Sequence, residues 1–115
     1  MRIKNEVTSM KKIPAITKQE LLAQLADGQY VLEFMAEWCP DCNFIKPHLP
    51  EIEADFPEYK FLQVDRDQNL DLFKEFNVFG IPSFIVFKNG KEVARLVNKS
   101  RKTKEDVEMF LRNIK

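Results

Sequence analysis

A nearly uninterrupted apolar run at residues 30–36 constrains the fold of this 115-residue chain more than any other feature. The run reads Tyr-Val-Leu-Glu-Phe-Met-Ala, and a second one, Phe-Ile-Val-Phe, occupies residues 84–87. Strands with apolar residues at successive positions are buried on both faces, which is typical of parallel sheets covered by helices. The two runs therefore predict an α/β architecture, with a central sheet flanked by helices on both faces.

Helices and further strands are predicted around these two runs. Capping boxes and helical periodicity indicate four helices, which begin near residues 17, 40, 69 and 103. Gly28 is expected to end the first helix and Pro47 to kink the second. Shorter strands are expected at residues 10–16, 61–65 and 92–97, with a hairpin turn at Asn89-Gly90. The predicted order is β-α-β-α-β-α-β-β-α, a mixed sheet with its hairpin last.

Composition and charge limit the classes of protein that this chain can represent. Eighteen basic and eighteen acidic residues cancel, so no overall charge draws the chain to nucleic acid or to an anionic membrane. The first twelve residues are polar, and no apolar run reaches the roughly 18 residues of a membrane span. We therefore expect a cytoplasmic monomer whose residues 1–115 form a single domain, with residues 1–9 as a loose lead-in.

The strongest chemical signal is Trp38-Cys39-Pro40-Asp41-Cys42, at the junction of the first apolar run and the second helix. If Cys39 is the N-cap residue, Pro40 takes the first helical position, where its missing N–H matters least. A thiolate on Cys39 can then accept a hydrogen bond from the first-turn amides and is favoured by the helix dipole. This placement predicts an exposed, activated nucleophile at Cys39 and a shielded resolving thiol at Cys42.

Other interpretations of the cysteine pair remain open at this point. The pair could be a structural disulfide, or two inert thiols in a binding module that has no redox activity. A Cys-x-x-Cys pair is also half of a zinc ligand set. His48 is the only histidine, so a closed metal or iron–sulfur site needs a carboxylate or a second subunit. We expect His48 instead to be a surface residue of its helix.

Several motifs together give the chain a resemblance to a known family. They are Glu33-Phe-Met-Ala-Glu-Trp-Cys39, Pro47, Gly80-Ile81-Pro82-Ser83 and Phe87-Lys88-Asn89-Gly90. In this order and spacing, over residues 10–115, they resemble thioredoxin. The Pro-Asp pair between the cysteines departs from the usual Gly-Pro, and it is similar to thioredoxin-related proteins with a Trp-Cys-Pro-Asp-Cys motif.

The resemblance implies a thioredoxin-like fold and a thiol–disulfide oxidoreductase that reduces protein or small-molecule disulfides and needs no bound cofactor. It makes Cys39 the attacking thiol and Cys42 the resolving one. It also implies a cis peptide bond before Pro82, which lies against the disulfide and presents the backbone of Ile81 to substrate. Trp38, Pro40 and Asp41 complete the implied substrate-binding surface. The implied partners are disulfide-containing proteins, with a thioredoxin reductase as one candidate electron donor.

The chain departs from the family pattern at a few positions near the dithiol. Glu33 stands where thioredoxins have a buried aspartate that assists proton transfer, and Phe61 is matched to its lysine partner. We expect Glu33 to be buried, to have a raised pKa and to exchange a proton with Cys42; alternatively, its side chain reaches water or a distant cation. Asn98 stands near the place of a glycine that thioredoxins have in the last strand. The basic cluster of Lys99, Arg101, Lys102 and Lys104 is expected to be a solvated turn.

Overall fold

A computed structural model describes residues 10–114 of the chain, so the expected lead-in at residues 1–9 lies outside the described part. The elements follow one another as predicted, except that the second helix is divided. They are β1 (Lys11–Lys12), α1 (Lys18–Gln24), β2 (Gln29–Met35), α2 (Pro40–Ile45), α3 (Leu49–Asp55), β3 (Lys60–Asp65), α4 (Leu70–Glu75), β4 (Ser83–Lys88), β5 (Lys91–Leu96) and α5 (Lys104–Arg112).

The five strands form one mixed sheet in the order β1-β3-β2-β4-β5. Strand β3 pairs in parallel with β1 and β2, whereas β4 runs antiparallel to β2 and β5. Asn89 and Gly90 both have positive φ angles and make the β4–β5 hairpin, as their sequence predicts. The sheet therefore places β2 at its centre, and the dithiol follows the carboxyl end of this central strand.

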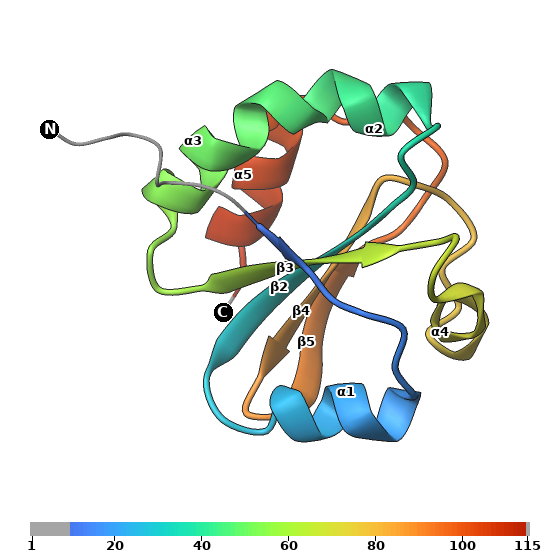
Figure 1. Ribbon diagram of the computed structural model, residues 1–115. Coiled ribbons are helices and arrows are strands. Elements are labelled where there is room, and N and C mark those ends of the chain that lie inside the picture. Colours follow the sequence, from blue (N-terminus) through green and yellow to red (C-terminus); the bar gives the residue numbers. More distant parts are fainter. Residues whose placement is uncertain (1–9, 115) are drawn as a thin grey trace, which may run out of the picture.

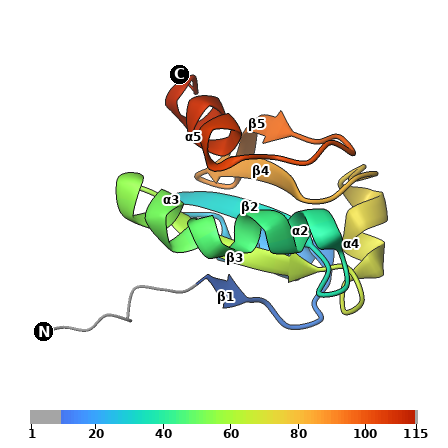
Figure 2. The same ribbon diagram turned by 90° about the horizontal axis from the view of Figure 1, so that it is seen from above.

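Helices cover both faces of the sheet, which confirms the expectation from the two apolar runs (Figures 1 and 2). Helices α2, α3 and α5 lie on one face, and α1 and α4 lie on the other. Alternate residues of β2 serve the two cores: Val31 packs with α3 and α5, whereas Leu32 and Phe34 pack with α1 and α4. Glu33 has the same parity as Val31 and consequently points toward the face that carries α2.

The long predicted helix at residues 40–56 is interrupted where Pro47 was expected to kink it. A single 3₁₀ turn, Lys46–His48, separates α2 from α3. Proline lacks an N–H and its ring clashes with the preceding turn, so the α-helical hydrogen-bond ladder stops there. The break gives a short α2, whose first turn carries Cys39 and Cys42, in front of a separate α3 that packs on the sheet.

Two local expectations need correction. The first strand is shorter than residues 10–16, because Pro14 offers no N–H and its carbonyl accepts a hydrogen bond from Asn69 Nδ2 at 3.1 Å. Helix α1 ends at Gln24 rather than next to Gly28. Gly28 instead adopts φ +103° in the turn that leads into β2. None of the helices formed by residues 10–114 has the length and apolar character needed to cross a bilayer.

Candidate active site

The two cysteines occupy the helix positions that the sequence predicts. Cys39 is the N-cap residue of α2, and its Sγ accepts a hydrogen bond from the backbone N–H of Cys42 at 3.1 Å. Pro40 takes the first helical position and Cys42 the third. Both cysteines are free thiols. The first turn of α2 therefore directs a backbone N–H at the sulfur of Cys39.

Burial of the pair differs from the expectation in one respect. Cys39 was predicted to be exposed, but it is 5% exposed, close to the 3% of Cys42. The difference arises because Met35 and Ala36 at the end of β2 form one apolar cluster with the two cysteines, and Ile81 from the loop before β4 packs against this cluster. Burial also raises the pKa of the Cys42 thiol above its ordinary value, and the neighbouring Cys39 and Glu33 act in the same direction. Cys42 is thus a protonated, shielded thiol.

Glu33 lies in the apolar layer beneath this pair, as its position in β2 predicts. It is 1% exposed, and burial raises its pKa from 4.5 to about 7. The effect is opposed by the Gln63 side chain, whose Nε2 donates a hydrogen bond to Glu33 Oε1 at 2.8 Å, and by the charge of Lys46. Glu33 is therefore a buried carboxyl with one neutral partner, and it does not reach water.

The residue opposite Glu33 is Gln63, not Phe61. In the parallel pairing of β2 with β3, Glu33 is in register with Gln63, and Phe61 is in register with Val31. The match of Phe61 to the position of the family's lysine is therefore wrong by two residues. A shift of two keeps the same face of the strand but moves the position along it. A neutral amide therefore stands where the resemblance led us to look for a lysine.

The loop before β4 forms the second wall of the site. The Ile81–Pro82 peptide bond is cis, which confirms the expectation for Pro82. Gly80 precedes it and has no room for a side chain, because a Cβ atom there would lie 2.3 Å from the carbonyl oxygen of Asn98. The Ser83 hydroxyl donates to the Gly80 carbonyl at 2.5 Å. The loop is thus fixed on both sides, with Ile81 against the dithiol.

Trp38 lies on the outer rim of the site and is 58% exposed. Its indole N–H donates to both carboxylate oxygens of Asp67, at 3.1 and 3.3 Å. The Arg66 guanidinium lies over the ring, 6.0 Å from its centroid. Trp38 is consequently a tethered surface aromatic rather than a core residue at the end of a strand.

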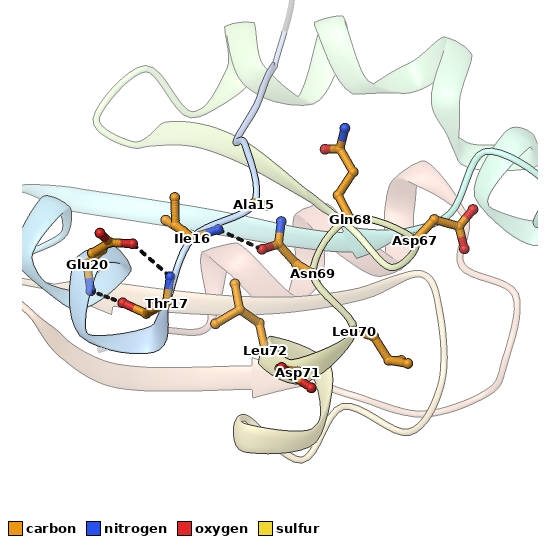
Figure 3. Close-up of a pocket in the computed structure, with 10 residues that line it drawn as sticks. All are labelled: Ala15, Ile16, Thr17, Glu20, Asp67, Gln68, Asn69, Leu70, Asp71 and Leu72. Atoms are coloured by element: carbon orange, nitrogen blue, oxygen red, sulfur yellow. Dashed lines mark hydrogen bonds between the residues drawn. The ribbon is translucent and has the colours of Figure 1, made fainter.

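Asp67 also borders a pocket of about 480 Å³ between the segment before α1 and the start of α4 (Figure 3). Inside it, Asn69 Oδ1 accepts a hydrogen bond from the Ile16 N–H at 3.1 Å, and Thr17 and Glu20 form the capping box of α1. The Asp67 carboxylate points away from these groups. The hydrogen bond between Ile16 and Asn69 therefore joins the segment before α1 to the start of α4. Asp67 links this pocket to the dithiol site through its hydrogen bonds with Trp38.

The basic cluster before α5 is not uniformly solvated, which corrects the expectation. Arg101 and Lys99 are exposed, but Lys102 is only 2% exposed. Lys102 is withdrawn from water because its ammonium group finds oxygen acceptors within its own loop. Arg101 Nε donates to Asp41 Oδ1 at 2.9 Å, so the loop before α5 contacts one of the two residues between the cysteines.

Three of these site residues were not predicted from sequence: Gln63, Asp67 and Arg101. Gln63 could have been found by pairing β2 with β3 residue by residue. Asp67 and Arg101 lie 29 and 60 positions from their partners, so no local pattern marks them. His48 is a surface residue as expected, with Nδ1 3.6 Å from a carboxylate oxygen of Glu51. Within residues 10–114, no three His, Cys, Asp or Glu side chains gather in a way that could hold a metal ion.

A pair of thiols in the first turn of a helix, directly after the central strand of a mixed sheet, defines a protein of the dithiol–disulfide exchange class. Comparison with known proteins agrees with this class. The family described as Thioredoxin matches residues 12–113. Thioredoxin of Chlamydia trachomatis is 33% identical over 85 residues, which cover 74% of this chain and 83% of that protein. Mitochondrial thioredoxin-3 of Saccharomyces cerevisiae is 29% identical over 97 residues, covering 84% and 76%.

The crystal structure of thioredoxin from Trypanosoma brucei brucei matches the fold with a TM-score of 0.79. The match covers 98% of this chain and 96% of that one, at 23% identity. The chain thus belongs to the thioredoxin family. With its two cysteines in this setting, it is a thiol–disulfide oxidoreductase.

Proposed function

We propose that this oxidoreductase works as a reductase in which Cys39 is the nucleophile and Cys42 the resolving thiol. The Cys39 thiolate attacks one sulfur of a substrate disulfide, and the other substrate sulfur leaves as a thiolate and takes a proton from solvent. Cys42 then loses its proton and attacks Cys39 Sγ, which releases the second substrate thiolate. Two electrons pass to the substrate, and a Cys39–Cys42 disulfide remains for a donor to reduce.

One observation carries this assignment: the hydrogen bond from the Cys42 amide to Cys39 Sγ. Only the N-cap sulfur receives this bond and faces the positive end of the helix dipole. The pKa of Cys42, by contrast, is raised by burial. In this proposal the thiol that accepts the amide hydrogen bond attacks, and the buried thiol with the raised pKa resolves.

Glu33 is the base that we propose for Cys42. A thiol with a raised pKa needs a proton acceptor before it can attack, and a carboxyl with a pKa of about 7 accepts protons near neutral pH. The charge of Glu33 acts on the Cys42 thiol and contributes to its raised pKa. The proton released by Cys42 thus remains in the site, on Glu33, while the disulfide closes.

The substrate-binding surface in this proposal surrounds the dithiol on the side of the Ile81–Pro82 loop. Ile81 is partly exposed and packs against the cluster that contains the two cysteines, and in this proposal its backbone binds an extended segment of substrate. Trp38 and Pro40, on the cysteine side of the site, are exposed, and Asp41 is partly exposed. Substrates are therefore expected to bind as extended chains that place a disulfide against the dithiol.

We further propose that the chain acts as a single-domain cytoplasmic monomer on disulfide-containing proteins. A dithiol reductase needs a compartment that keeps returning it to the reduced form, and thioredoxin reductase is one donor that could do so. Sedimentation of the purified protein and fractionation of cells that express it test the oligomeric state and the compartment.

Trapping of the mixed disulfide tests the roles of the cysteines. Cys42→Ser should accumulate mixed disulfides with substrates in a lysate, because the attacking thiol remains and nothing resolves the product. Cys39→Ser is the matched control and should trap none. If only Cys39→Ser forms adducts, the two roles are reversed. Insulin reduction with dithiothreitol, and separately with thioredoxin reductase and NADPH, then distinguishes general reductase chemistry from use of that particular donor.

A further inference from the structure

The loop between β5 and α5 places a cation beside Asp41, one of the two residues between the cysteines. Arg101 Nε lies 2.9 Å from Asp41 Oδ1, and the Arg101 guanidinium carbon lies 4.4 Å from the centroid of the Phe44 ring. Both contacts reach the first two turns of α2. A charge-assisted hydrogen bond combined with a cation–π contact holds the guanidinium in one place. Arg101 is thus positioned beside Asp41 by two independent contacts.

The next residue, Lys102, brings a second positive charge, and this one is buried. Its Nζ donates to the carbonyl oxygens of Asn98 and Ser100 at 3.2 and 2.6 Å, and to Asn98 Oδ1 at 2.8 Å. An ammonium group has three N–H donors, whereas a neutral amine has two, so three oxygen acceptors match the charged form. Burial lowers the pKa of Lys102, and the negative charge of Asp41, joined by that of a thiolate at Cys39, opposes this effect.

The Lys102 loop is also joined to the second wall of the active site. Two of the three acceptors of Lys102 belong to Asn98, whose carbonyl oxygen lies against Gly80. Gly80 precedes Ile81, which packs on the dithiol. Lys102 therefore binds Asn98, the residue through which its own loop contacts the loop that bears Ile81.

The negative charge of Asp41 is the charge that these two cations offset. Its carboxylate lies in the first turn of α2, where a negative charge opposes a thiolate at the N-cap. We propose that Arg101 and Lys102 are positioning residues for the exchange reaction: Arg101 neutralises Asp41, and the buried Lys102 ammonium supplies a positive charge that favours the Cys39 thiolate. This inference rests on the proposed role of Cys39 as the nucleophile.

The experiment measures the rate at which iodoacetamide alkylates Cys39 at pH 7, in a Cys42→Ser background that leaves one thiol. Arg101→Gln and Lys102→Met should each slow alkylation roughly threefold to tenfold, because each leaves the thiolate less compensated. Lys99→Gln removes an exposed charge from the same loop and should leave the rate unchanged. Arg101→Lys keeps a cation near Asp41 and should recover part of the rate.

A charge cycle separates this electrostatic role from a merely structural one. Adding Asp41→Asn to Arg101→Gln removes both members of the ion pair, so the double variant should return to the parent rate. About 1 M salt should weaken the effect of the exposed Arg101 and leave that of the buried Lys102 largely intact. If Lys102→Met does not fold, as judged by circular dichroism, the Arg101 and Asp41 cycle alone decides the proposal.

Unchanged alkylation rates in folded Arg101→Gln and Lys102→Met would overturn the inference. A double variant that stays as slow as Arg101→Gln would also overturn it. The parent protein distinguishes these failures from failure of the proposed function. If Cys39 of the parent neither reacts with iodoacetamide nor traps substrates, the nucleophile assignment itself is wrong. If Cys39 of the parent reacts with iodoacetamide and traps substrates, and the variants are alkylated at the same rate, only the proposed role of the two cations is wrong.

Discussion

Glu33→Gln tests the buried carboxyl at the centre of the proposed proton exchange. Glutamine keeps the shape of the side chain, and its carbonyl oxygen can still accept the hydrogen bond from Gln63 Nε2 that Glu33 Oε1 accepts now. The substitution removes the ability to ionise and replaces one carboxyl oxygen by an amide NH2 group. Its effect on the free energy of unfolding should therefore depend on pH.

The size and sign of this dependence follow from the pKa of Glu33. In the unfolded chain the carboxyl titrates near 4.5, and burial raises its pKa to about 7 in the folded protein. Between these values the folded state binds more protons than the unfolded state, so stability falls as pH rises. Each pKa unit corresponds to about 1.4 kcal/mol. The wild type should thus lose about 3 kcal/mol, to order of magnitude, relative to Glu33→Gln between pH 4 and pH 8.

Urea unfolding of both reduced proteins at a series of pH values measures this difference. At pH 4 the wild type carries a protonated Glu33 and should be about as stable as Glu33→Gln. At pH 8 the variant should be the more stable protein. Glu75→Gln, at the exposed end of α4, is the matched control and should stay within about 0.5 kcal/mol of wild type. A difference between wild type and Glu33→Gln that does not vary with pH would refute the raised pKa, and the proton-exchange role with it.

Two further predictions concern the walls of the site. Gly80→Ala should destabilise the protein by about 1–3 kcal/mol in urea unfolding, since its Cβ would lie 2.3 Å from a backbone oxygen of Asn98; a stability equal to wild type would mean that the loops separate easily. Asp67→Ala should lower the fluorescence anisotropy of Trp38, the only tryptophan, because the indole loses its hydrogen-bonded tether. An anisotropy that stays the same would show that the tether does not restrain the ring.

The sequence predicted the fold well where short-range physics decides it. Burial of β2 on both faces, the break at Pro47 and the turn at Asn89-Gly90 each follow from the residue itself or its immediate neighbours. The first strand was overestimated because its apolar pattern continues past Pro14. The competing hydrogen bonds there come from Asn69, which is distant in sequence.

The candidate site was predicted less completely, for a similar reason. Cys39 and Cys42 follow from helix capping, which is a local property. The exposure of Cys39 was misjudged because Ile81, which covers it, arrives from a distant loop. Likewise, Lys102 looked like one charge among several on a turn. The burial of Lys102 depends on how the loop folds back on itself, and the residue composition of the loop does not reveal this.

The departures of this chain from the thioredoxin pattern are connected by where positive charge lies. Gln63, opposite Glu33, carries no charge, so the carboxyl keeps a raised pKa and can accept a proton near neutral pH. A lysine at that position would hold Glu33 ionised and remove this capacity. In the proposed mechanism the cations lie instead on the side of Asp41, through Arg101 and Lys102. The arrangement therefore places an ionisable carboxyl, Glu33, near Cys42 and puts the compensating positive charge on the other side of the dithiol, where Arg101 pairs with Asp41 and Lys102 interacts with both thiols.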